Sequence, residues 1–97
     1  MTPILVRPAA AADIEEAVAW YGRLDASLAD RFLAAVEGTV AKIAANPTMY
    51  SVIHRDIRRA LVERFPYGIY YRIYPDVVVI LACMHARRDP KRWRGRK

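Results

Sequence analysis

The chain has 97 residues, of which 55% are hydrophobic and 27% charged, and it contains one cysteine. This length fits one domain, and this composition excludes intrinsic disorder. A single cysteine excludes a disulfide framework, and no cluster of cysteine and histidine suggests a metal site, so we expect neither metal nor cofactor. No apolar run approaches the roughly 18 residues of a membrane span, and the N-terminus does not resemble a secretory signal. We therefore expect a cytoplasmic protein without membrane contact.

Positive charge is concentrated in the second half of the sequence. The net charge of +6 comes from 16 Lys and Arg against 10 Asp and Glu. Residues 1–54 have four basic and six acidic residues (−2), and residues 55–97 have twelve basic and four acidic residues (+8), which together give +6. Most of the basic residues are arginine, which suits bidentate contacts with phosphate or carboxylate. The pattern favours a nucleic acid or an acidic protein segment as partner, and the alternative is a solvated charged face.

The first half of the chain predicts a short strand followed by two helices. Residues 4–7 lie between two prolines and are β-prone. Residues 9–24 have apolar side chains at helical spacing. A second helical pattern begins near Ser27, the expected N-cap, and ends at Asn46 because a proline follows. The link between the helices is short, so we expect an antiparallel helical hairpin.

The second half of the chain predicts three strands. They cover residues 57–65, 67–74 and 77–84. The last of these is apolar on both faces, which is typical of a central strand. Residues 85–97 include seven basic residues, and we expect this tail to fray at its end.

These elements predict an α+β domain of order β-α-α-β-β-β. The helical hairpin is expected to pack on one face of a small, mainly antiparallel four-stranded sheet. The other face would present Tyr70 and Arg72 to solvent or to a partner. Trp20 and Leu33 lie off the buried stripes of their helices, so they are either edge packing or part of a docking patch.

Four segments of the chain form an ordered set of motifs. Residues 10–21 read A-x-x-D-I-E-E-A-x-x-W-Y, residues 32–36 read F-L-A-A-V, and residues 43–47 read I-A-A-N-P. Residues 58–93 contain R-x-x-x-x-x-F-P-Y-x-I-Y-Y and then H-x-R-R-D-P-x-x-W. This set is similar to the ParE-like plasmid stabilisation members of the ParE/RelE toxin superfamily. The resemblance covers nearly the whole chain and implies one toxin domain over residues 1–97, silenced by a cognate antitoxin.

The resemblance implies one of two toxin activities. ParE-like toxins inhibit DNA gyrase through protein contacts without a catalytic site. RelE-like toxins cleave mRNA on the ribosome, which needs an acid, a base and cations around one phosphate. The candidate catalytic residues for that chemistry here are Arg58, Arg59, His85, Arg87 and Trp93.

The candidate catalytic residues depart from the RelE-like pattern. Arg87 matches the late catalytic arginine of the family, but Trp93 replaces its terminal tyrosine and cannot transfer a proton. Gly68 stands where a mid-sheet arginine is expected, and the paired strand lysines are missing. We favour gyrase inhibition, with mRNA cleavage as the alternative, so whether the chain is an enzyme stays open. A non-toxic nucleic-acid-binding or interaction module is a further alternative.

The implied partner is an antitoxin with an acidic C-terminal tail that wraps the toxin as a helix and an extended strand. The complex would be a hetero-oligomer, and its acidic side chains would meet the basic half of this chain. The candidate residues for contact with the antitoxin or the target are Trp20, Leu33, Arg58, Tyr70, Arg72, Arg87, Arg88, Arg92 and Trp93.

Overall fold

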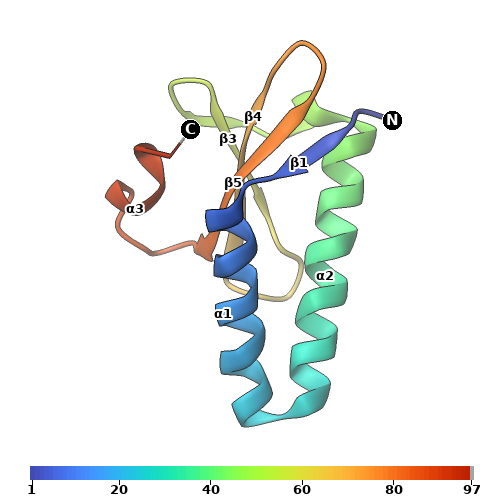
Figure 1. Ribbon diagram of the computed structural model, residues 1–97, viewed down its shortest axis with the longest axis vertical. Coiled ribbons are helices and arrows are strands. Elements are labelled where there is room, and N and C mark those ends of the chain that lie inside the picture. Colours follow the sequence, from blue (N-terminus) through green and yellow to red (C-terminus); the bar gives the residue numbers. More distant parts are fainter. Residues whose placement is uncertain (97) are drawn as a thin grey trace.

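Two long helices cover one face of a five-stranded sheet, and a short third helix lies at the other face (Figure 1). The computed structural model describes residues 1–96. The elements are β1 (Ile4–Val6), α1 (Pro8–Leu24), α2 (Ala26–Ala45), the 3-10 turn η1 (Pro47–Met49), β2 (Val52–His54), β3 (Ile57–Leu61), β4 (Tyr67–Ile73), β5 (Val78–His85) and α3 (Lys91–Arg94). Within residues 1–96, no helix is both long and apolar enough to span a membrane.

The sheet has the strand order β1-β5-β4-β3-β2 and is mixed. β1 runs parallel to β5, and the other three pairings are antiparallel. The prediction of four strands is therefore wrong by one strand, because β2 has only three residues and its sequence shows no alternation. β2 turns into β3 at Arg55, whose positive φ of 51° permits the tight reversal.

The helical hairpin forms as predicted, with one change at the cap. Asp25, not Ser27, is the N-cap of α2, and its carboxylate accepts a hydrogen bond from the Ser27 backbone N–H at 2.9 Å. This backbone bond, followed by one from the Ser27 hydroxyl, lowers the pKa of the Asp25 carboxyl. α2 ends at Ala45, close to the predicted stop before Pro47.

The main core lies between the hairpin and the sheet. Phe32 and Ile43 from α2 and Tyr71 of β4 are fully buried in this cluster. The Tyr71 hydroxyl donates a hydrogen bond of 2.6 Å to the Pro47 carbonyl, and burial raises its pKa to about 12. Tyr71 therefore connects the sheet to the end of α2.

The C-terminal segment covers part of the sheet face that points away from the hairpin. Trp93 of α3 is only 4% exposed, and its ring stacks on Tyr70 with a centroid distance of 4.6 Å. Ile57, Val79 and Leu81 belong to the same buried cluster. The prediction that this face is open is therefore wrong where Trp93 covers Tyr70. The tail forms a short helix at residues 91–94, and the prediction that it frays at its end stays a prediction. Lys97, the last residue of that prediction, lies outside the described residues.

A β-bulge interrupts β5 at Leu81. Tyr70 pairs with Ala82 and Tyr71 pairs with Ile80, so Leu81 is the extra residue. Leu81 and Ala82 both join the cluster under Trp93, while Ile80 and Cys83 face the hairpin. The bulge therefore widens the surface on which α3 packs.

Candidate partner-binding groove

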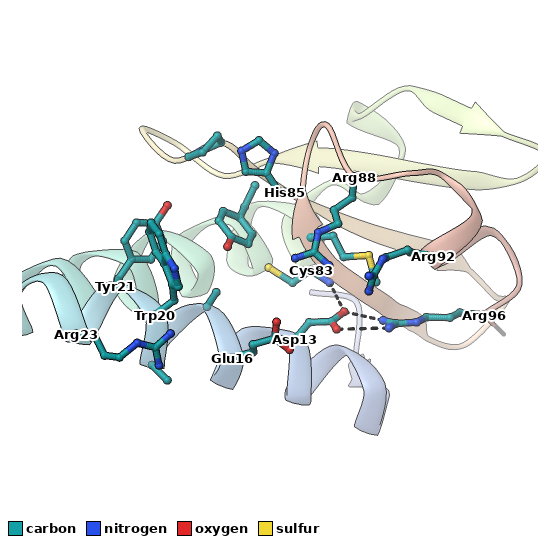
Figure 2. Close-up of a pocket in the computed structure, with 15 residues that line it drawn as sticks. Asp13, Glu16, Trp20, Tyr21, Arg23, Cys83, His85, Arg88, Arg92 and Arg96 are labelled. Atoms are coloured by element: carbon teal, nitrogen blue, oxygen red, sulfur yellow. Dashed lines mark hydrogen bonds and ion pairs between the residues drawn. The ribbon is translucent and has the colours of Figure 1, made fainter.

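A groove of about 490 Å³ lies between α1 and the C-terminal end of β5 (Figure 2). We call it the α1 groove. Its lining comes from α1, the start of β4 and the residue before it, β5, and the segment after β5. The lining residues are Asp13, Glu16, Ala17, Ala19, Trp20, Tyr21, Arg23, Pro66, Tyr67, Cys83, Met84, His85, Arg88, Arg92 and Arg96.

The α1 groove exists because β1 is shorter than β5. β1 pairs with β5 as far as Val6 opposite Ile80, and the Arg7 N–H donates to the Ile80 carbonyl. Pro8 then starts α1, which leads the chain away from the sheet. Beyond Ile80, the side of β5 that is turned away from β4 has no strand beside it among residues 1–96.

Aromatic side chains form one wall of the α1 groove. Trp20 is half exposed and meets Tyr21 edge to face at 5.1 Å. Tyr67 lies 6.1 Å from Tyr21 and 5.8 Å from the His85 ring. Burial raises the pKa of both tyrosines, so their hydroxyls stay protonated at neutral pH and can donate hydrogen bonds.

The rim of the α1 groove carries three arginines available to a partner. Within residues 1–96, Arg23, Arg88 and Arg92 have no carboxylate within 4.0 Å. The acidic residues of the lining are Glu16 and Asp13, of which Asp13 is already paired. The groove is therefore suited to an anionic ligand that also presents apolar surface.

Asp13 connects α1 to both β5 and the C-terminal segment. Its Oδ2 accepts 3.0 Å from the Cys83 backbone N–H and 2.6 Å from Arg96 Nη1. Arg96 Nη1 also lies 3.1 Å from the Leu81 carbonyl, to which it donates (Figure 2 shows the ion pair). Burial, together with the charge of Asp13, raises the pKa of the Cys83 thiol to about 12.

Comparison with known proteins identifies the family. The family model described as "ParE toxin of type II toxin-antitoxin system, parDE" matches residues 4–90. The chain belongs to the ParE toxin family. A solved structure titled "Chromosomal ParDE TA system from P. aeruginosa" is 20% identical, with a TM-score of 0.78 over 88% of this chain and 96% of that chain, a likeness in fold. No curated protein matches this chain.

The structure of this ParE toxin brings four of the predicted site residues into the α1 groove. They are Trp20, His85, Arg88 and Arg92. His85 is held by a 3.2 Å hydrogen bond that its Nδ1 accepts from the Arg87 N–H. Arg87 itself is exposed and lies outside the groove, as does Leu33 on α2.

The remaining predicted residues lie elsewhere on the ParE fold. Arg58 stands opposite Tyr71 in the sheet and donates 2.6 Å to the Tyr50 carbonyl. Arg72 forms a 2.8 Å ion pair with Asp56. Tyr70 and Trp93 are buried against each other on the far face. The basic residues thus occupy several separate surfaces instead of one.

Sequence reasoning missed Asp13, Glu16, Arg23 and Arg96 as groove residues. For Asp13 a signal was present, since Ala10 and Ala17 mark the buried stripe of α1 and Asp13 lies between them. A carboxylate on a buried stripe needs a partner, which here is Arg96. Among residues 1–96, no group of three or more His, Cys, Asp or Glu side chains is placed to hold a metal ion.

Proposed function

We propose that this ParE toxin inhibits DNA gyrase by protein contact. The observation that carries the proposal is the dispersal of the residues that mRNA cleavage would need. Cleavage requires an acid, a base and cations within a few ångströms of one phosphate. Family membership supports the same choice, because the matching family is that of ParE toxins. Since gyrase acts on the chromosome, this function would take place in the cytoplasm.

The candidate catalytic residues face different directions. Arg58 and Arg59 are neighbours on β3, so the alternation of a strand sends them to opposite faces, beside Tyr71 and Tyr70 respectively. His85 lies in the α1 groove, on the hairpin side of the sheet. Trp93 is buried on the far face and cannot stack on a base. No single phosphate can contact all of these side chains.

Gly68 also argues against mRNA cleavage by this chain. A RelE-like active site would need an arginine there, but a Cβ at Gly68 would lie 2.9 Å from Cδ of Arg59. The stem of Arg59 therefore lies over Gly68, and any longer side chain would have to displace it.

We further propose that a cognate antitoxin neutralises the toxin by placing an acidic segment in the α1 groove. Arg23, Arg88 and Arg92 surround the groove without ion-pair partners among residues 1–96. Trp20 offers an apolar surface at its edge. A segment with both carboxylates and apolar side chains would match this arrangement.

Two parallel assays separate the targets. The purified toxin is added to a gyrase supercoiling reaction and to a cell-free translation reaction programmed with mRNA. We expect inhibition of supercoiling and intact mRNA. Cleaved mRNA with normal supercoiling would refute gyrase inhibition and support the ribosomal alternative.

A matched pair of variants tests the antitoxin site. Arg88 lines the α1 groove and the adjacent Arg87 does not, yet both are exposed. Calorimetry with the antitoxin encoded beside the toxin should show that Arg88→Glu weakens binding by about tenfold or more, and more so at low salt. Arg87→Glu should change the affinity much less. Equal effects from both variants would mean that the groove is not the site.

A further inference from the structure

The C-terminal segment of the chain passes around the open edge of β5. Trp93 is anchored on the far face of the sheet, where it stacks on Tyr70. Three residues later, Arg96 pairs with Asp13 of α1, which packs on the hairpin side. We call residues 89–96 the C-terminal strap. Trp93 and Arg96 therefore fix the strap on opposite sides of the same strand.

The strap covers β5 at the first position that β1 leaves open. β1 pairs no further than Ile80. The next groups at this edge are the Leu81 carbonyl, which accepts from Arg96, and the Cys83 N–H, which donates to Asp13. A neighbouring strand would use these same two backbone groups. The Asp13–Arg96 ion pair thus occupies the backbone groups that a neighbouring strand would use, and it protects this edge of β5 from pairing with another chain.

We propose that the C-terminal strap is an autoinhibitory latch, and that Arg96 must leave Asp13 before an extended acidic segment of the antitoxin can lie along β5. This inference rests on the proposed antitoxin site in the α1 groove. The strap and the antitoxin segment compete for the same edge of β5. Only toxin molecules with an open strap can bind this segment, so the apparent affinity for the antitoxin equals the affinity of the open form multiplied by the fraction of molecules that are open.

The geometry makes the latch able to open without unfolding the protein. The Arg96 side chain is 27% exposed and that of Asp13 is 16% exposed, so water reaches both. Trp93 is a separate anchor, so the end of the strap can swing away while α3 stays docked.

The first experiment uses the free toxin. Asp13→Asn removes the charge that holds Arg96, and Glu16→Gln is the matched control because Glu16 lines the same groove with no ion pair of its own among residues 1–96. We expect Asp13→Asn to speed tryptic cleavage after Arg94 by about tenfold, and to raise amide exchange at Cys83, with circular dichroism unchanged. Cleavage equal to that of Glu16→Gln would overturn the latch.

The second experiment measures affinity for the antitoxin encoded beside the toxin. Arg96→Gln and Arg92→Gln each remove one positive charge from the α1 groove. Charge alone predicts weaker binding by both variants, whereas the latch predicts that Arg96→Gln binds about three- to tenfold more tightly and Arg92→Gln more weakly. Weaker binding by Arg96→Gln would overturn the latch. Failure of the wild-type toxin to bind would refute the antitoxin site instead, and the protease result would still decide whether the strap opens.

Discussion

Replacing Trp93 by alanine is expected to destabilise the protein strongly, although Trp93 lies in a basic segment near the chain end. The side chain is 4% exposed and stacks on Tyr70 at 4.6 Å. Burying about 200 Å² of an aromatic side chain at about 25 cal/mol/Å² gives an upper bound of about 5 kcal/mol. In Trp93→Ala the strap can detach and regain conformational entropy, so we expect a loss of about 3 kcal/mol in the free energy of unfolding.

Urea unfolding followed by circular dichroism measures this loss. Trp20→Ala is the matched control, because Trp20 is 50% exposed and its removal should cost about 1 kcal/mol or less. A loss of about 3 kcal/mol should also lower Tm by about 12–24 °C in a domain of this size. If Trp93→Ala were no less stable than Trp20→Ala, the far face would not be a second core and the anchor of the strap would be lost.

Three further predictions concern buried or partly buried polar groups. Tyr71→Phe removes the donor to the Pro47 carbonyl and should cost about 1–2 kcal/mol in urea unfolding, and a neutral result would contradict the role of this bond. Burial, followed by the charges of nearby arginines, lowers the pKa of His54 below its usual 6.5. The contribution of neutral His54 to the free energy of unfolding is therefore complete above pH 6.5 and is lost as the pH falls through the lowered pKa. As a result, His54→Gln should flatten the decline of the urea midpoint between about pH 7.5 and 5. Because its pKa is about 12 and it is buried, Cys83 should react with iodoacetamide at pH 8 only as fast as the protein opens, and immediate labelling of the native state would refute this.

The elements with strong local signals were predictable from the sequence. α1 and α2 have apolar stripes of helical period, and the proline after Asn46 stops α2 in any tertiary context. β5 is apolar on both faces, and the structure buries it from Val78 to Met84. Local sequence also indicated where α2 begins, although the N-cap is Asp25 and not the predicted Ser27.

The features that depend on distant contacts were not predictable. Nothing in residues 4–6 indicates that β1 joins β5 in parallel, because that choice depends on which edge of the sheet remains free. Trp93 lies between arginines without any periodic pattern, so its burial becomes visible only when Tyr70 is placed opposite it. The Asp13–Arg96 pair joins residues 83 positions apart, and one sequence gives no covariation to reveal it.

Net charge was a weaker guide to the partner site than strand length. The +8 of the second half suggested one cationic surface, but the alternation of β3 sends Arg58 and Arg59 to opposite faces. The groove arises instead because β1 stops opposite Ile80, three strand residues into a β5 of eight. A β1 longer by five residues would cover the remaining edge of β5, from residue 81 to residue 85. It would remove the groove and leave the C-terminal strap nothing to protect. The same short strand therefore accounts for both the proposed binding site and the latch that competes for it.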